Sequence, residues 1–419
     1  MKNLQNSFIQ GIGNTPLIKL KAASEITGCN VYGKAEYLNP GGSVKDRAAL
    51  ALIKDAEEKK LILKGGTIVE GTAGNTGIGL CLLGNSLGYK TIIVMNDNQT
   101  QEKKDTLRNI GAELRLVPPK PYKDDANFVK VAGRLAEELK PKNNNGVVWA
   151  NQFDNVANSK GHYENTGPEI WSQTDGKVDG FVCSSGTGGT IAGVSNALKE
   201  KNKDIKIYLS DPKGSALYNY IVNGELKSEG GSITEGIGSS RITKNFATAK
   251  IDGAFSIDDK ESLPIIYDLI QNEGLSLGTS CGVNIAGAIR LGKELGPGHT
   301  IVTILCDKSD RYNSKLFNKS FLKEKGLPFP NWIWVIWYQN IIKVKNKKSS
   351  MAYILLIFWP FIYFFPLTSE YIVMGNDFDL IYFSYKKYIF EFLQEGQIPL
   401  WSPSEGSGFT LIYNPFAQF

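Results

Sequence analysis

The chain has 419 residues, enough for two or three domains with separate cores. Its 47 lysines and arginines exceed its 42 aspartates and glutamates by 5, an excess too small to indicate a nucleic-acid partner. The two histidines have no i,i+4 companion of the kind that a helical zinc site uses, so we expect no metal ion. Five cysteines without CxxC spacing are typical of reduced, buried thiols inside a cell.

Residues 1–20 contain no apolar run long enough for a signal sequence or an anchor, so we expect a cytoplasmic catalytic part. From residue 31 to about residue 307, short apolar runs alternate with longer amphipathic stretches. We predict strands within 30–36, 66–71, 90–96, 147–153, 178–185, 205–211 and 299–307, and helices such as 46–60, 79–88 and 128–140. This alternation predicts a doubly wound α/β fold, with function in loops at the carboxyl ends of strands.

The stretch NPGGSVKDRAAL (39–50) places Lys45 at the start of a predicted helix. In one interpretation, Ser43 and Asp46 cap this helix and Lys45 points into water. A phosphate-binding loop of the P-loop type is a poor match. In a P-loop the lysine directly follows the last glycine, whereas here two residues separate Lys45 from the last glycine and the acidic Asp46 stands beside it. In a third interpretation, Lys45 forms a Schiff base with an aldehyde cofactor, which requires partners elsewhere in the chain.

Clusters of glycine and hydroxyl residues stand near three further helix starts, GTAGNTG (71–77), GTGGT (186–190) and GTSCG (278–282). Each cluster alone is consistent with an ordinary tight turn. In GTGGT, the small residues leave backbone N–H groups unobstructed at a helix N-terminus, where they suit a phosphate group. Thr187 and Thr190 can add hydroxyl donors there.

The other two clusters offer polar side chains at the same kind of position. Asn75, Thr72 and Thr76 can donate hydrogen bonds to a substrate carboxylate. Ser280 either caps the helix that follows it or faces a ligand. The glycine and hydroxyl clusters together favour a small-molecule site over a set of unrelated turns.

Taken in order, the motifs of residues 11–330 resemble those of the pyridoxal-phosphate enzymes of fold type II (tryptophan synthase β-like). The resemblance is strongest to the cysteine synthases, or O-acetylserine sulfhydrylases, and to the catalytic core of the cystathionine β-synthases. The stretches that carry it are IGNTPLIKL (12–20), NPGGSVKDRAA (39–49), EGTAGNTGIGL (70–80), NQFDNVANSKGHYENTGPEIW (151–171), GTGGT (186–190) and GTSCG (278–282). The resemblance implies a homodimer and two doubly wound domains with the cofactor cleft between them. The larger domain would comprise 1–37 and 157–330, and the smaller one 38–156.

The resemblance also implies a role for each matching residue. Lys45 would be the catalytic Schiff-base lysine, Asn75 the partner of the phenolic oxygen of pyridoxal 5'-phosphate, and Ser280 the residue facing its pyridine nitrogen. The phosphate cradle would consist of Gly186, Thr187, Gly188, Gly189 and Thr190. The residues expected to bind the amino-acid substrate are Thr72, Ala73, Gly74, Thr76 and Gln152.

The implied reaction is a β-replacement that forms L-cysteine from O-acetyl-L-serine and sulfide through an aminoacrylate. Two alternatives are a cystathionine β-synthase-like or other β-elimination or replacement on a serine derivative, and a non-enzymatic regulatory partner of serine acetyltransferase. Dehydratases of the same fold are less similar, because they carry histidine in place of Thr76 and often cysteine in place of Ser280.

The chain departs from the family pattern in its substrate loop. Ala73 replaces a serine that touches the substrate, which removes a hydrogen bond worth about 1 kcal/mol. Gly71 replaces a common proline. The segment 117–129 is longer and richer in proline than expected, and its sequence suggests no role. These departures leave the preferred substrate and sulfur donor open.

The composition changes after residue 330. A basic and aromatic linker (331–350) precedes eighteen uncharged residues (351–368), which predict a membrane-spanning helix with the lysines on its cytoplasmic side. Residues 369–419 resemble the first extracytoplasmic loop of polytopic bacterial membrane proteins related to lipid-linked-sugar glycosyltransferases, through Asp377, Asp379, GQIPLWSP and NPF. We therefore expect either a membrane-tethered enzyme or a soluble one with a fused or read-through tail.

Overall fold

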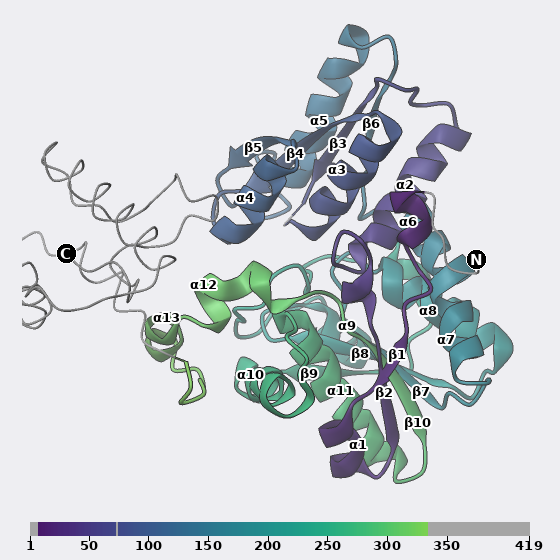
Figure 1. The fold of residues 1–419 in the computed structure, drawn as a ribbon, viewed down its shortest axis with the longest axis vertical. Helices are drawn as coiled ribbons and strands as arrows, with labels where there is room; N and C mark the ends of the chain where they lie inside the picture. The colour runs from purple at the N-terminus through teal and green to yellow at the C-terminus, as the bar shows by residue number, and fades with distance from the viewer. Residues whose placement is uncertain (1–6, 73, 334–419) are drawn as a thin grey trace, which may run out of the picture. The chain divides into compact units, whose positions relative to one another are not determined.

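The computed structural model describes residues 7–72 and 74–333, and within them the chain forms ten strands in two sheets (Figure 1). The six-stranded sheet has the order β1-β2-β10-β7-β8-β9, and the four-stranded sheet has the order β5-β4-β3-β6. The strands are β1 (Leu17–Lys19), β2 (Asn30–Lys34), β3 (Thr67–Gly71), β4 (Lys90–Asn96), β5 (Glu113–Val117), β6 (Val147–Trp149), β7 (Gly180–Cys183), β8 (Lys206–Pro212), β9 (Gly253–Ile257) and β10 (Thr300–Ile304).

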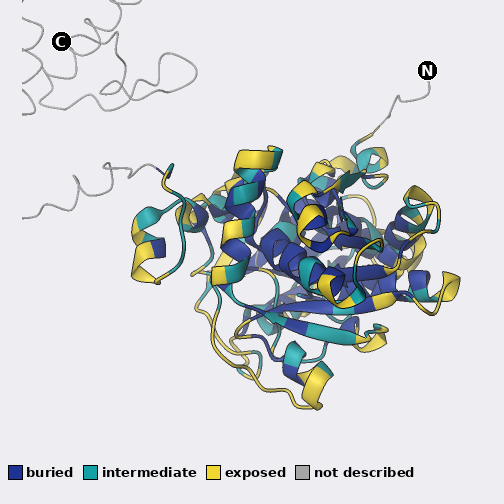
Figure 2. Ribbon diagram, turned by 90° about the horizontal axis from the view of Figure 1, so that it is seen from below, coloured by how far each residue is buried: buried dark blue, intermediate teal, exposed yellow. Residues whose placement is uncertain are grey.

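The helices cover both sheets (Figure 1). Those that precede β7 are α1 (Lys21–Thr27), α2 (Lys45–Glu58), α3 (Asn75–Leu87), α4 (Gln101–Asn109), α5 (Phe128–Leu139), α6 (Ala157–Gly161) and α7 (Gly167–Gln173). Those that follow it are α8 (Gly189–Lys201), α9 (Leu217–Asn223), α10 (Asp259–Asp268), α11 (Thr279–Leu295), α12 (Asn313–Leu316) and α13 (Lys319–Glu324). Figure 2 shows the inward helix faces and most of the central strands buried, and the outer helix faces exposed.

In the four-stranded sheet, all neighbouring strands are parallel, and successive residues of β4 face opposite sides. Ile92 and Val94 pack in a cluster with residues of α5. Ile93 and Met95 pack instead with residues of α3 and α4. Both faces of this sheet are therefore covered, which explains why its central strands are continuous apolar runs.

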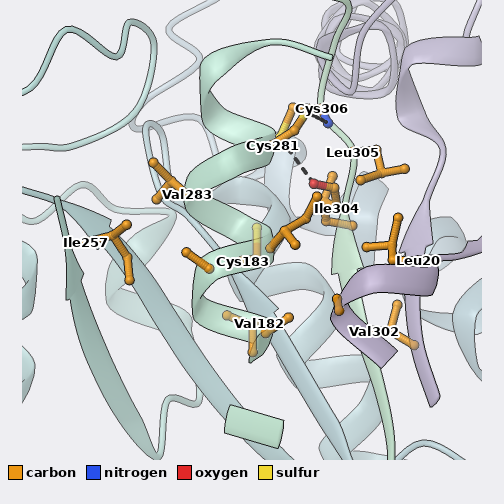
Figure 3. Close-up of a cluster of buried hydrophobic side chains, with 14 of the residues drawn as sticks. Leu20, Val182, Cys183, Ile257, Cys281, Val283, Val302, Ile304, Leu305 and Cys306 are labelled. Carbon is orange, nitrogen blue, oxygen red and sulfur yellow. Dashed lines mark hydrogen bonds between the residues drawn. The ribbon is translucent and has the colours of Figure 1, made fainter. Parts of the chain in front are cut away.

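The six-stranded sheet is parallel except for the antiparallel pairing of β1 with β2. Its side chains and those of α11 share one large core cluster, part of which Figure 3 shows. Since both sheets are mainly parallel with helices packed on them, the predicted doubly wound α/β class is confirmed. The predicted boundaries of the two domains stay a prediction.

Each of the seven predicted strands is present, with shifts of a few residues at the ends. The strand predicted within 147–153 ends at Trp149, because the chain turns there toward the site. The helix predicted at 79–88 begins earlier, at Asn75. Strands β1, β5 and β9 were not predicted.

The first residues of the predicted linker pack on the core rather than leaving it. Ile333 is 5% exposed, and the ring of Trp332 lies edge-on to Tyr267 with 6.2 Å between ring centroids. The predicted membrane span (351–368) and the segment 369–419 lie outside the described residues. Among the helices of residues 7–72 and 74–333, none has the length and apolar character needed to cross a bilayer.

Candidate active site

A cavity of about 220 Å³ collects residues from loops that follow strands of both sheets. Nine of the thirteen predicted site residues line it, together with residues that the sequence did not single out. Those nine are Lys45, Thr72, Gly74, Asn75, Thr76, Gln152, Gly186, Thr187 and Ser280. Gly188 and Thr190 line a smaller adjoining cavity, which Lys45 also borders. Ala73 lies outside the described residues.

Lys45 is the first residue of α2 and borders both cavities. Ser43 and Asp46 fix this helix start: Ser43 Oγ accepts a hydrogen bond from the Lys45 backbone N–H (3.2 Å), and Asp46 Oδ2 accepts one from the Gly41 N–H (2.6 Å). Both side chains therefore hold the backbone at this helix start, but the N-cap of α2 is Val44, which has no side-chain cap, so the predicted capping by Ser43 and Asp46 is right only in part. Lys45 itself does not simply point into water, because it borders the same cavities as the glycine loop.

Two glycines of the GTGGT stretch lie so close to neighbouring atoms that no side chain fits at their positions. A Cβ on Gly186 would lie 2.3 Å from the Gly236 carbonyl oxygen, and one on Gly189 would lie 2.1 Å from Asn158 Oδ1. Glycine is therefore required at both positions, and α8 begins at Gly189 with its N–H groups toward the loop.

Two buried hydroxyls, Ser184 Oγ and Ser185 Oγ, have no hydrogen-bond partner among the described residues. Unpartnered donors next to a helix N-terminus and a glycine loop fit a phosphate group. Beyond the loop, Thr190 Oγ1 lies 3.2 Å from Nε2 of His162, whose Nδ1 lies 2.8 Å from Thr166 Oγ1. Burial, followed by the positive charges of Arg47 and Lys45, lowers the pKa of His162 to about 3. His162 is therefore neutral at physiological pH.

The amide of Asn75 is held by residues that follow β10. Its Nδ2 donates to Asp307 Oδ2 (2.6 Å), and its Oδ1 accepts from Nη1 of Arg311 (2.7 Å). Tyr312 Oη also donates to Asp307 Oδ2 (2.5 Å), and Arg311 bonds to the carbonyl oxygen of Gly41. One hydrogen of Nδ2 stays available toward the cavity that Asn75 lines.

Asp307, Arg311 and Tyr312 were missed by sequence analysis. The available signal was the charged stretch CDKSDRY (306–312), which directly follows a buried strand, as the glycine clusters do. The rule that sites lie at the carboxyl ends of parallel strands applied to this stretch as well.

In the predicted substrate loop, the polar groups are bonded to one another. Thr76 Oγ1 donates to Gln152 Oε1 (2.5 Å), and Gln152 Nε2 donates to the carbonyl oxygen of Gly71 (3.2 Å). The Gly74 N–H donates to Thr72 Oγ1 (3.2 Å). Thus Thr72, Thr76 and Gln152 lie together at the cavity, and their role in binding substrate stays a prediction.

The departure at Gly71 has a structural reason. A Cβ on Gly71 would lie 2.8 Å from the Phe128 carbonyl oxygen, so the start of α5 leaves no room for proline. Phe128 also lines the cavity. It is the last residue but one of the segment 117–129, in which the ring centroid of Tyr122 lies 4.0 Å from the Arg241 guanidinium carbon. This segment therefore helps to build one wall of the cavity.

Lys103 and Glu235 form a buried ion pair at the cavity. Lys103, on α4, has its Nζ 2.6 Å from Glu235 Oε2, and Lys315 Nζ lies 2.5 Å from Glu235 Oε1. Lys103 Nζ also lies 4.3 Å from the centroid of the Tyr312 ring. Because Lys103 and Glu235 both line the cavity, charged groups of opposite sign border the space above the predicted substrate loop.

A loop for a phosphate, a lysine at the same cavity and a hydroxyl at the start of α11 define a site for a phosphorylated aldehyde cofactor. Residues 8–307 match the family of pyridoxal-phosphate dependent enzymes, and the chain belongs to this family. Its cofactor is therefore pyridoxal 5'-phosphate.

Three relatives illustrate the similarity. Cysteine synthase 1 of Emericella nidulans is 50% identical over 327 residues, which cover 77% of this chain and 87% of that protein. Cysteine synthase of Dictyostelium discoideum is 44% identical over 333 residues, covering 77% and 86%. The solved structure of the O-acetylserine-dependent cystathionine β-synthase of Helicobacter pylori has 32% identity and a TM-score of 0.66, covering 75% of this chain and 98% of that one.

Proposed function

We propose that this chain is a cysteine synthase, which forms L-cysteine from O-acetyl-L-serine and sulfide with pyridoxal 5'-phosphate. The observation that carries the proposal is the meeting of Lys45, Ser280 and the GTGGT loop at adjoining cavities, in a chain 50% identical to a cysteine synthase. The alignment with the two cysteine synthases covers most of the length of each, which supports the complete cysteine synthase reaction for this chain.

The cofactor would be held at three points. Gly186, Thr187, Gly188, Gly189 and Thr190 would bind its phosphate through backbone N–H groups and hydroxyls. Asn75 would donate to its phenolic oxygen, and Ser280 would face its ring nitrogen. When bound, the cofactor supplies an electron sink, and a neutral hydroxyl beside the ring nitrogen makes that sink weaker than a carboxylate would. A weaker sink favours β-elimination and replacement over transamination.

Lys45 would have two roles in the reaction, both at the same point of the cavity. Its amine would hold the cofactor covalently before the substrate arrives and, once released, would take the proton from the substrate α-carbon. Its position at the first turn of α2, fixed by Ser43 and Asp46, suits both roles because the amine reaches a defined point in the cavity.

The substrate carboxylate would lie at the start of α3. Thr72, Gly74, Thr76 and Gln152 border the cavity there, and Ala73 stands in the same loop. The helix N-terminus favours an anion at this point. Because Ala73 has no hydroxyl, the substrate would be held with one hydrogen bond fewer than a serine in this place would allow, a difference of about 1 kcal/mol.

The experiment compares the full chain with Lys45→Ala, reading the absorbance of the bound cofactor between roughly 300 and 550 nm. We expect O-acetylserine to shift the wild-type band and sulfide to restore it, with cysteine released. Lys45→Ala should show neither change. Lys54→Ala, an exposed lysine on the same helix, is the matched control and should behave as wild type.

Other outcomes identify the alternatives. A band that O-acetylserine shifts but that only homocysteine restores would favour a cystathionine β-synthase-like reaction. Cofactor binding without turnover of any serine derivative, together with capture of a serine acetyltransferase C-terminal peptide, would favour a regulatory partner. Either result would overturn the assignment to cysteine synthesis.

A homodimer in a cytoplasmic setting is part of the proposal. For the C-terminal part, the membrane span at 351–368 and the likeness of 369–419 to a glycosyltransferase-related protein stay predictions. Fractionation of cells that express the full chain tests them. Full-length protein, verified by mass, in the soluble fraction would contradict a spanning helix.

A further inference from the structure

Three of the five cysteines lie in one core cluster, and two of them, Cys281 and Cys306, lie next to one another (Figure 3). Cys183 ends β7, Cys281 lies in the first turn of α11, and Cys306 follows β10. Cys281 directly follows Ser280, and Cys306 borders the same cavity as Lys45. The proposed reaction gives none of these thiols a role.

Cys281 and Cys306 are in direct contact. The Cys306 backbone N–H donates to Cys281 Sγ (3.1 Å), and Cys281 Sγ donates to the carbonyl oxygen of Asp307 (3.6 Å). Asn284 Nδ2 also donates to Cys306 Sγ (3.4 Å). Cys281 is fully buried, whereas Cys306 is 9% exposed and borders the cavity. One sulfur is thus reachable from the cavity, and the other lies directly behind it.

The surroundings of the two thiols shift their pKa values in opposite directions. The interaction with the Cys281 side chain and the nearby charge of Lys45 outweigh burial and lower the pKa of Cys306. Burial raises the pKa of Cys281 well above its ordinary value. Since the thiolate is the reactive form, Cys306 is the sulfur that attacks an electrophile, and Cys281 is a protonated thiol beside it.

We propose that Cys306 and Cys281 form a peroxide-sensitive thiol pair, in which Cys306 is oxidised first and Cys281 then closes a reversible disulfide. The Cys306 sulfur attacks one oxygen of hydrogen peroxide, the O–O bond breaks, and hydroxide leaves and is protonated to water. The Cys281 sulfur attacks the resulting sulfenic acid, the S–S bond forms, and the S–O bond breaks with loss of a second water. In total, two thiols and one peroxide give one disulfide and two waters.

Closing this bond would disturb the site. A disulfide holds its sulfurs about 2.05 Å apart, closer than two thiols that are not bonded. Ser280 precedes one sulfur, and Asp307, which holds Asn75 at 2.6 Å, follows the other. We therefore expect oxidation to reduce activity at least severalfold, and dithiothreitol to restore it.

The test treats the cofactor-loaded full chain with hydrogen peroxide in the absence of sulfide, which would itself reduce a disulfide. Free thiols are then alkylated and tryptic peptides are identified by mass. Each of the five cysteines lies on a different tryptic peptide, so links can be assigned without ambiguity. The expected product joins 261–290 to 294–308, with a mass two hydrogens lower than the sum of the two peptides.

Variants separate the two steps. Cys281→Ser should leave a sulfenic acid at Cys306 that dimedone traps, and Cys306→Ser should leave Cys281 reduced. Cys81→Ala is the matched control: this buried thiol lies on α3, and burial raises its pKa to about 11, so the pair should oxidise as in wild type. Sulfinic acid at Cys306 without the linked peptide, a link between Cys183 and Cys306 instead, or equal oxidation of all five cysteines would each overturn the proposal.

Discussion

At the scale of single residues, Asp46 should make stability depend on pH. Its carboxylate is fully buried, and burial raises its pKa to about 7, against the opposing hydrogen bond from the Gly41 N–H and the charge of Arg311. The pKa in the folded state therefore lies above the ordinary value of 3.8. Between these two values the folded state binds more protons than the unfolded state, so the free energy of unfolding falls as pH rises through this window.

We predict that the free energy of unfolding of Asp46→Asn falls less steeply with rising pH than that of the wild type, because asparagine cannot ionise. The full effect of such a shift is at most about 4 kcal/mol. Urea unfolding at several pH values between about 4 and 8 measures it in both proteins. Parallel profiles for wild type and variant would show that Asp46 is not the titrating group.

His162 should act on the cofactor through Thr190. Replacing it by leucine removes the partner of Thr190 Oγ1 and leaves the fully buried Thr166 hydroxyl without its ring nitrogen. The lost hydrogen bond leaves the Thr190 hydroxyl without the partner that orients it, a loss of about 1 kcal/mol in phosphate binding, so we predict a roughly fivefold loss of cofactor affinity. Absorbance titration of the apoprotein with pyridoxal 5'-phosphate measures this affinity. Unchanged affinity in a variant that folds normally would separate His162 from the phosphate loop.

At the scale of elements, the sequence predicted the central strands and the edge strand β6, and it missed the other three edge strands. Strands β1 and β9 are the edges of the six-stranded sheet, and β5 is an edge of the four-stranded sheet. A central strand such as β7 is buried at every residue, and its GFVC sequence is a continuous apolar run. In β5, none of the five residues is buried, and its ELRLV sequence has no such run. An edge strand is stabilised by its one neighbour, which the local sequence does not reveal.

Arg47 joins α2 to two other elements. Its guanidinium bonds to both carboxylate oxygens of Glu36 (2.7 and 2.9 Å) and of Glu169 (2.7 Å each). Burial opposes the ionisation of Glu169, but the hydrogen bonds and charge of Arg47, with those of Lys34, lower its pKa to about 2. The helix that carries Lys45 is thus fixed by a buried ion cluster.

We predict that Arg47→Met lowers the free energy of unfolding by about 3–5 kcal/mol, because it leaves the buried Glu36 and the partly buried Glu169 without their main partner. The matched control is Arg108→Met, in a half-exposed pair with Asp105 at 3.2 Å, which should cost less than about 1 kcal/mol. Urea unfolding of both variants measures the difference. Equal losses would mean that the cluster adds nothing beyond a surface ion pair.

At the scale of the whole molecule, the site depends on contacts that a linear motif cannot show. Asn75 and Asp307 are 232 residues apart, yet their side chains lie 2.6 Å from one another. The motifs around Lys45, Asn75 and GTGGT predicted one site, since each has a local pattern of glycine and polar residues. The ion pair of Lys103 and Glu235 has no such pattern, because each is an ordinary charge whose partner is set by the packing of the two sheets.

The packing of Trp332 and Ile333 on the core marks the C-terminal end of the catalytic unit. Residues 1–335 form one compact unit, and within it Ile333 is buried and Trp332 packs against Tyr267 and Phe317, with ring centroids 6.2 and 6.3 Å apart. We predict that a chain ending at residue 335 keeps the activity and the unfolding midpoint of the catalytic unit in the full chain. A chain ending at Pro330 loses both apolar side chains and should unfold with a free energy lower by about 3 kcal/mol or more.

Urea unfolding and cysteine formation, measured on both truncated chains and the full chain, test this boundary. Loss of activity on truncation at residue 335 would show that 336–419 contribute to catalysis, and the catalytic unit would then extend past the core that residues 7–333 build. Equal stability of the two truncated chains would contradict a packing role for Trp332 and Ile333. Because both cuts remove the predicted membrane span, a difference between them can arise only from residues 331–335, and the core contacts of Trp332 and Ile333 are the physical reason to expect one.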